Sequence, residues 1–181
     1  QGILFENGCH VARLALIFDH CQIACGVRVL WMRAGWAERP FGLDAYDVQV
    51  HDYSIRAASP DDLDGARALM LDTVYHDFGT GYVPRWHADI IDPAAAYLAS
   101  PRHTLLVALD ARGGVVGTAA LDSRGPAHPP NPRHLAERYP SGATAQLRRV
   151  YVRPEHRRRG LARRLVHELL AFAAADGGYH A

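Results

Sequence analysis

Lysine is absent from this sequence, since all 20 basic residues among its 181 positions are arginine. That absence excludes a lysine Schiff base and a P-loop lysine as the source of the protein's chemistry. An excess of either charge is missing too, because 19 acidic residues leave a formal net charge of +1. A chain so close to neutral is not expected to have nucleic acid as its partner.

Cysteine is scarce and confined to the N-terminal part of the chain. The three cysteines lie between positions 9 and 25 and provide no disulfide framework. Together with two histidines they match no standard zinc pattern, because no C-x-x-C pair occurs among Cys9, His10, His20, Cys21 and Cys25. We therefore expect no metal site, and we interpret these cysteines as buried or incidental thiols.

Long hydrophobic runs are also missing. The longest, Leu14–Phe18 within Val11–Phe18, ends at Asp19 and is far shorter than a bilayer span. The chain has no basic start followed by an apolar stretch and a small-residue cleavage site, so a secretory signal is not expected. These absences predict a cytoplasmic protein with no membrane partner.

The composition that remains is that of an ordinary globular protein, with 49% hydrophobic and 22% charged residues. The length predicts one domain with room for an appendage. We interpret residues 1–45, which show no clear period, as a poorly specified N-terminal extension, and residues 46–181 as the domain. Met32 is a plausible start, which would make residues 1–31 an upstream leader.

The first half of the domain is predicted to be a strand followed by helices. Alternating apolar residues indicate a strand near 52–57. Ser59-Pro60-Asp61-Asp62 is a strong helix start, because Ser59 can cap and the aspartates complement the helix dipole. Helical spacing of apolar residues extends this helix to about Tyr75. A glycine-containing loop at 76–84 and two short helices should follow, at 85–91 and at 92–100, the second with Tyr97 and Leu98 on its apolar side.

The second half is predicted to be mostly strands. A hairpin joins strands at 104–109 and 115–121 through Arg112-Gly113-Gly114. A proline-rich loop at 125–140, with a helical turn at 134–138, precedes a strand at 143–152 and a helix at 161–174. The apolar stripe of that helix consists of Leu161, Leu165, Leu169 and Phe172, widened by Val166, Leu170 and Ala173. This order of elements predicts an α+β fold with a mostly antiparallel sheet flanked by helices.

The most informative segment runs from Leu147 to Arg164 and reads LRRVYVRPEHRRRGLARR. It consists of an alternating strand, a proline, and Arg157-x-x-Gly160-x-Ala162 at the opening of a helix. The first N–H groups of a helix have no internal partner and carry partial positive charge, so this place suits an anion. Gly160 has no Cβ to keep a ligand away from the backbone, and several arginines add charge. The segment therefore predicts a pyrophosphate site.

Arg157 to Ala162 resembles the R/Q-x-x-G-x-G/A signature of the GNAT superfamily of acyl-CoA-dependent N-acyltransferases, and Val150-Tyr151-Val152-Arg153-Pro154 resembles that family's preceding strand. With its upstream elements the similarity covers roughly Tyr53 to Ala181. It implies acetyl-CoA as acyl donor, with pyrophosphate on the loop and pantetheine along the strand. The residues that match the family's cofactor contacts are Val150, Tyr151, Val152, Arg157, Arg158, Arg159, Gly160, Leu161, Ala162 and Arg163.

The resemblance implies N-acetylation of a small or peptidic amine by direct attack on the thioester. Members of this family often place a glutamate base near the start of the motif strand, where this chain has Gln146, which cannot take a proton. No catalytic residue is therefore assigned; Glu155, Asp122 and Glu137 are candidates, each better explained as a surface carboxylate. Arg148, Arg149 and Arg153 are interpreted as the solvent side of the strand.

Several alternatives remain open at this point. Gln146 is compatible with a second reading, an acyl-CoA-binding sensor or scaffold without turnover. Residues 76–87, with Tyr82 and Trp86, and the loop at 125–140 are candidates for the acceptor site, although packing onto the core explains them equally well. Oligomerisation is compatible with the sequence. The family's further strand, helix and closing hairpin would follow Ala181, so we expect this chain to be an incomplete GNAT-like domain.

Overall fold

The computed structural model describes residues 52–125, 132–139, 141–142 and 144–175. Four antiparallel strands form one sheet in the order β1-β2-β3-β4. Their bounds are β1 (Ser54–Ala57), β2 (Thr104–Leu109), β3 (Val115–Asp122) and β4 (Gln146–Val152). The predicted α+β architecture is confirmed, whereas the expected extension at 1–45 and the cysteines lie outside the described residues.

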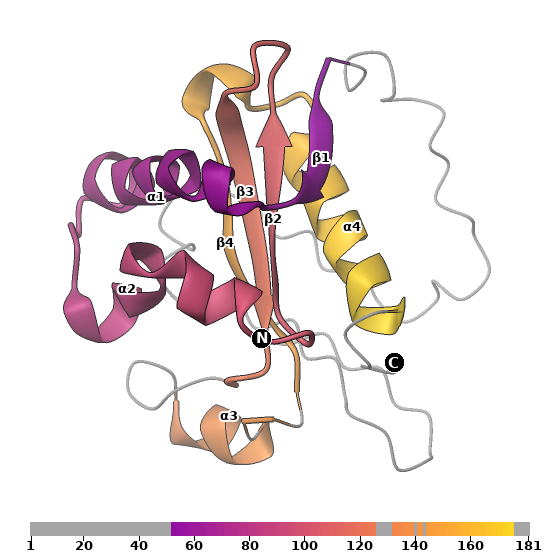
Figure 1. Cartoon of the computed structure of the whole chain (residues 1–181). Helices are drawn as coiled ribbons and strands as arrows, with labels where there is room; N and C mark the ends of the chain where they lie inside the picture. Colours follow the sequence, from indigo (N-terminus) through magenta and orange to yellow (C-terminus); the bar gives the residue numbers. More distant parts are fainter. Residues whose placement is uncertain (1–51, 126–131, 140, 143, 176–181) are drawn as a thin grey trace.

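Helices cover both faces of this sheet (Figure 1). The longer ones are α1 (Leu63–Asp72), α2 (Pro84–Ile91), α3 (Arg133–Arg138) and α4 (Leu161–Ala175), with short turns η5 (Pro60–Asp62), η6 (Thr73–Asp77), η7 (Ala94–Leu98) and η8 (Pro154–His156). Helix α4 packs on one face, while α1, α2 and η7 pack on the other. No helix in the described part of the chain combines the length and the apolar character needed to cross a membrane.

The predicted helix start at Ser59 is present and more elaborate than a simple cap. The backbone N–H and the hydroxyl of Ser59 donate to the Asp62 carboxylate at 2.7 and 2.6 Å. Arg56 from β1 adds a fork of two hydrogen bonds to the same carboxylate, at 2.6 and 2.9 Å. Asp62 therefore connects the end of β1 to the first helical turn.

Three predicted boundaries or orientations are wrong. The helix expected to end near Tyr75 continues through η6 to Asp77, because the Phe78 N–H still bonds the Thr73 carbonyl. Leu98, expected on an apolar face, is 38% exposed, and only Tyr97 is buried. The strand expected from position 143 is regular only from Gln146.

Of the two faces of the sheet, the one under α4 agrees better with the prediction from the sequence. Leu161, Leu165 and Leu169 are at most 2% exposed, as the helical stripe predicts, and Phe172 packs at its margin. Gly117 of β3 permits this contact, because a Cβ there would lie 3.1 Å from Leu165 Cδ1. Burial of the stripe fixes the start of α4 beside the end of β4.

Candidate active site

Strand β4 contains a β-bulge at Arg149 and Val150. Its register pairs Ala120 with Arg148 and Thr118 with Tyr151, so two residues of β4 oppose Ala119 alone. Arg149 has a φ of 53°, in the left-handed region, and the Thr118 hydroxyl donates to its carbonyl at 2.9 Å. A bulge interrupts the ladder and re-aims the neighbouring side chains. Because β4 is the last strand in the described sheet, this interruption lies at an edge.

The turn after β4 leads directly into the helix that carries the predicted anion site. The single turn η8 is followed by an exposed segment from Arg157 to Gly160, and Gly160 has a φ of 78°. Leu161, only 2% exposed, anchors the first turn of α4 to the core, while Ala162 and Arg163 face outward. The N–H groups of that first turn have no carbonyl partner within the helix. An accessible helix N-terminus therefore lies next to the edge of β4.

Two of the arginines in this turn contact other protein groups. Arg157 Nε donates to the Val152 carbonyl at 2.7 Å, and its guanidinium forms an ion pair with Asp77 of η6. Arg159 donates to the Tyr53 hydroxyl at 3.0 Å, and that hydroxyl lies 2.9 Å from His156 Nδ1. These contacts fix the shape of the turn and connect it to η6 and to Tyr53, the residue just before β1.

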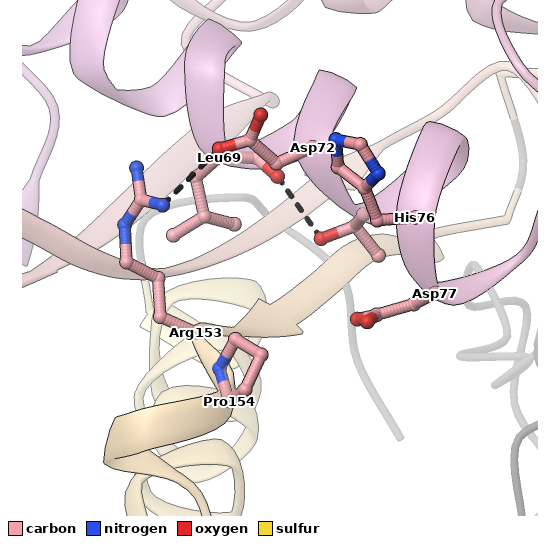
Figure 2. A pocket seen from close by; sticks show the side chains of 7 residues that line it. Leu69, Asp72, His76, Asp77, Arg153 and Pro154 are labelled. Carbon is pink, nitrogen blue, oxygen red and sulfur yellow. Dashed lines mark hydrogen bonds and ion pairs between the residues drawn. The ribbon is translucent and has the colours of Figure 1, made fainter.

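A cavity of about 310 Å³ opens beside this turn, between α1 with η6 and the end of β4 (Figure 2). Arg153 spans part of it, donating to Asp72 at 3.2 Å and to the Val115 carbonyl at 3.2 Å. Its walls carry charges of both signs and are formed by Leu69, Asp72, Thr73, His76, Asp77, Arg153 and Pro154. The cavity therefore borders the edge of β4 on the side of the turn from Arg157 to Gly160.

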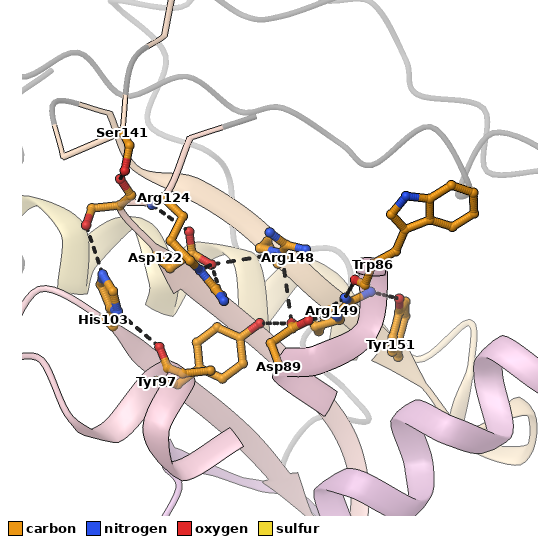
Figure 3. Close-up of polar contacts among 12 residues, drawn as sticks. Trp86, Asp89, Tyr97, His103, Asp122, Arg124, Ser141, Arg148, Arg149 and Tyr151 are labelled. Atoms are coloured by element: carbon orange, nitrogen blue, oxygen red, sulfur yellow. Dashed lines mark hydrogen bonds and ion pairs between the residues drawn. The ribbon is translucent and has the colours of Figure 1, made fainter. Parts of the chain in front are cut away.

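A buried ion pair joins the bulge to α2. Arg149, which is 3% exposed, donates to both carboxylate oxygens of Asp89, at 2.8 and 2.7 Å, and to the Trp86 carbonyl at 2.7 Å. The Tyr97 hydroxyl donates to Asp89 as well (Figure 3). Arg149 is thus not on the solvent side of the strand as its sequence position predicted, because the bulge turns its side chain into the molecule.

The protonation states in this network follow from its contacts. Burial alone would raise the pKa of Asp89, but the hydrogen bonds and charge of Arg149, the charge of Arg148 and the Tyr97 hydroxyl hold that pKa well below its usual range. Burial, followed by the charge of Asp89, raises the pKa of Tyr97. Asp89 is therefore ionised at neutral pH and Tyr97 is a hydrogen-bond donor.

A second carboxylate lies on the same face of the sheet. Asp122, at the end of β3, is fully buried and accepts the backbone N–H of Arg124 at 2.9 Å and its Nε at 2.8 Å. The Nε of Arg148 lies 3.9 Å from Asp122 and 3.9 Å from Asp89, between the two carboxylates (Figure 3). The interpretation of Asp122 as a surface carboxylate is wrong, whereas Glu155 and Glu137 are exposed as expected.

Gln146 completes this face of β4. It lies directly across from Asp122 in the register and is 2% exposed. Its Oε1 has no hydrogen-bond partner among the described residues. Since buried polar atoms are almost always satisfied, such an atom marks a place where a donor is expected to bind.

The two predicted acceptor regions differ in how they relate to these groups. Trp86 is 40% exposed, and its carbonyl binds Arg149, so α2 does border the network. The ring of Tyr82 lies 6.1 Å from that of His87, which is buried. In the proline-rich region, Arg133–Arg138 forms α3 as expected and residues 126–131 lie outside the described part. Within the described ranges no group of three or more potential metal ligands occurs.

Sequence reasoning missed Asp89 altogether, and it placed Tyr97 on an apolar helix face without predicting its hydrogen bond to Asp89. Asp89 lies in a short helix, and no motif distinguishes it from an ordinary surface aspartate. The only available signal was its position on the apolar side of that helix, next to Ile90. A buried aspartate requires a cationic partner, and the partner came from β4, 60 residues away.

The profile of the acetyltransferase (GNAT) family matches residues 71–181. The chain belongs to this family. It is therefore an acetyltransferase, and the expected acyl donor, acetyl-CoA, is that of the family. No match was found among curated proteins.

Solved GNAT structures share the fold. An acetyltransferase of the GNAT family from Staphylococcus aureus Mu50 superimposes with a TM-score of 0.54 at 12% identity, covering 70% of this chain and 69% of that one. A GNAT acetyltransferase from Brucella melitensis, solved in complex with acetyl-CoA, has a TM-score of 0.49 at 21% identity, with 71% and 72% covered. At 12% identity the similarity to the Staphylococcus aureus structure concerns the fold alone, and the α+β arrangement is the shared feature.

Proposed function

We propose that this acetyltransferase transfers the acetyl group of acetyl-CoA to a primary amine by direct attack, and that residues 46–181 belong to its catalytic domain. One observation carries the proposal: a bulged edge strand ends beside an accessible helix N-terminus whose turn contains Gly160 at a φ of 78°. An edge strand can pair with the amide groups of an extended ligand, and a helix N-terminus can bind its phosphates.

The residues fit acetyl-CoA in the following way. The pyrophosphate would lie on the turn from Arg157 to Ala162, with Arg163 at its margin, where the N–H groups and guanidinium groups attract anions. The pantetheine arm would follow the backbone of Val150, Tyr151 and Val152. The acetyl group then lies near the bulge, where the ladder is interrupted and backbone groups are available.

The reaction exchanges one acyl bond for another. The acceptor nitrogen forms a C–N bond with the acetyl carbon, the C–S bond breaks, and CoA leaves as a thiol after taking up the proton that the nitrogen loses. Uncharged amine is required for attack, because an ammonium has no free electron pair. The chain's own part is to hold the donor along β4 and to orient the amine on the face that carries Gln146.

A glycine substitution tests the donor site. Gly160→Val should weaken acetyl-CoA binding at least tenfold, about 1.4 kcal/mol, because a branched side chain at this turn keeps the pyrophosphate from the N–H groups. Gly160→Ala should have a smaller effect. Calorimetric titration with acetyl-CoA measures the affinity, and release of free thiol with a panel of amines measures turnover.

Gly113→Val is the matched control. Gly113 has a φ of 80°, as strained for a side chain as Gly160, but it lies in the β2–β3 hairpin with nothing within 4 Å of an added Cβ. Both variants should lose stability, and only Gly160→Val should lose affinity. Wild-type affinity in Gly160→Val would remove the turn from the donor site.

A further inference from the structure

Among the described residues, the buried face of β4 offers a ligand one unpartnered hydrogen-bond acceptor, while the carboxylates beside it are already engaged by arginine. Gln146 Oε1 is buried and has no partner among the described residues. An amide oxygen accepts hydrogen bonds at any pH but is not a base. A ligand that satisfies it must bring an N–H or O–H group, as the amine of the acceptor does.

Both carboxylates on this face are engaged by arginine. Asp89 is held through both oxygens by Arg149, and Asp122 is held through both oxygens by Arg124. The guanidinium of Arg148 lies between them. The contacts of Arg149 and Arg148 hold the pKa of Asp89 well below its usual range, so Asp89 is a poor proton acceptor. Both oxygens of Asp122 already accept hydrogen bonds from Arg124.

The described tyrosines and histidines nearest to Asp89 and Asp122 are also engaged. Tyr97 of η7 donates to Asp89, and Tyr151 of β4 lies 3.3 Å from Arg149 Nη1. His87 of α2 accepts the Val83 N–H through Nδ1 at 2.9 Å. His103, just before β2, bonds the Ala96 carbonyl and the Ser123 hydroxyl at 3.0 and 2.9 Å.

The charge on this face favours an uncharged ligand. Three guanidinium groups, those of Arg124, Arg148 and Arg149, lie around only two carboxylates, those of Asp89 and Asp122. Gln146 lies directly across from Asp122 in the register of the sheet. Positive charge in a poorly solvated site disfavours an ammonium group and favours the neutral amine. The site therefore selects the reactive form of the acceptor without generating it.

We propose that the acceptor is a weakly basic primary amine, such as an α-amino group or an arylamine, which binds uncharged and donates an N–H to Gln146 Oε1 directly or through one water. This inference rests on the proposed acetyl transfer. The proton balance needs no enzyme base, since the proton lost by the nitrogen neutralises the departing CoA thiolate.

The enzyme should therefore prefer acceptor amines of low pKa over strongly basic ones at neutral pH. An α-amino group has an ordinary pKa of about 7.7–8.0 and a lysine side chain one of about 10.4, so at pH 7 the neutral fractions differ by about 300-fold. Alkylamines of high basicity, such as lysine side chains and polyamines, are then poor acceptors at neutral pH.

Two matched probes test this on the full chain: L-alaninamide, which has only an α-amine, and Nα-acetyl-L-lysinamide, which has only a side-chain amine. At pH 7, kcat/KM for alaninamide should exceed that for acetyl-lysinamide by at least about 100-fold, and its logarithm should rise with pH at a slope of one up to the probe's own pKa. Equal use of both probes, or turnover of neither, overturns the inference.

Substitutions of Gln146 test its role separately. Gln146→Leu removes the amide oxygen that would accept the N–H of the amine, and it replaces the side chain with one of similar size. This variant should raise KM for alaninamide at least fivefold and leave the pH profile unchanged. Gln146→Glu supplies a carboxylate and should raise kcat/KM below the probe's pKa. Glu168→Gln, on the exposed side of α4, is the control and should change neither quantity. A wild-type KM in Gln146→Leu overturns the inference, even if Gln146→Glu does not fold.

The outcomes also separate this inference from the proposed function. Calorimetry with acetyl-CoA reports the donor site alone. If acetyl-CoA binds and acetyl-lysinamide is the better acceptor, acetyl transfer stands and the inference falls. If acetyl-CoA does not bind at all, the proposed function is wrong, and the inference that rests on it is wrong as well.

Discussion

Arg157, the first residue of the turn predicted to bind phosphate, contacts both β4 and η6. Its guanidinium is shared between the Val152 carbonyl and the Asp77 carboxylate, so a phosphate that binds there competes with Asp77 for the same donors. Arginine can bind only a limited number of oxygens in the plane of its fork. Asp77 should therefore lower the affinity for acetyl-CoA.

Replacing Asp77 measures that competition. Asp77→Asn should tighten acetyl-CoA binding about two- to fivefold, because exposed ion pairs contribute about 0–1 kcal/mol. Asp64→Asn is the control, since Asp64 forms an exposed pair with Arg67 elsewhere on α1. Calorimetry at two salt concentrations gives the affinities. Weaker binding by Asp77→Asn would mean that Asp77 orients Arg157 rather than competing for it.

Single residues also show where sequence reasoning succeeded and failed in this site. The turn from Arg157 to Ala162 was predictable, because its chemistry depends on a local order of strand, glycine and helix. Arg149 was assigned to the solvent side of its strand, and the bulge that turns it inward has no signature in LRRVYV. Asp122 was interpreted as a surface carboxylate, and its burial at the end of β3 is a property of the folded sheet. The pairing of Arg149 with Asp89, 60 residues away, is a property of the folded chain alone.

At the scale of elements, the junction of β1 and η5 depends on one carboxylate. The hydrogen bonds from Arg56, and then those from Ser59, lower the pKa of Asp62 from 3.8 to about 2 despite its burial. A pKa lowered by folding means that the ionised form stabilises the native state. This stabilisation is fully present above about pH 4 and is lost as the pH falls towards 2.

The corresponding variant is Asp62→Asn. At pH 7 it should lower the free energy of unfolding by about 1–2 kcal/mol, because it weakens the fork from Arg56 and the cap at Ser59. The difference from wild type should shrink between pH 4 and pH 2. Urea denaturation across this range measures it, with Asp61→Asn on the exposed side of the same turn as control. A difference that stays constant to pH 2 would contradict the assigned role of the charge.

Elements themselves were largely predictable where local signals coincide. The hairpin of β2 and β3 follows from its turn glycines, and α4 follows from a stripe that is indeed buried. The continuation into η6 was not predictable, since glycines at 79 and 81 mark the loop but not where the helix before it ends. Packing of Thr73 and Val74 into the core extends that helix beyond its propensity.

At the scale of the whole molecule, β4 connects the proposed phosphate-binding turn (Arg157 to Ala162) with the buried polar network. The end of β4 leads into that turn and then into α4, which packs on one face of the sheet. Gln146, Arg148 and Arg149 lie on the side of the opposite helical layer. Arg149 belongs to the bulge and, through Asp89, to α2 as well. The geometry of the proposed acetyl site thus depends on a buried ion pair between two layers of the fold.

A double-mutant cycle tests this dependence. Asp89→Leu leaves the Arg149 guanidinium buried without its carboxylate, and Arg149→Met leaves Asp89 with only Tyr97 and the more distant Arg148; each should cost about 3–5 kcal/mol of unfolding free energy. The double variant removes both charges together and should be more stable than the sum of the two losses predicts, with a coupling energy of at least about 1 kcal/mol. Denaturant titration of all four proteins at pH 7 gives this energy. Strictly additive losses would mean that the pair does not hold α2 to the bulge, and that packing around Tyr97 and Trp86 maintains the layer without it.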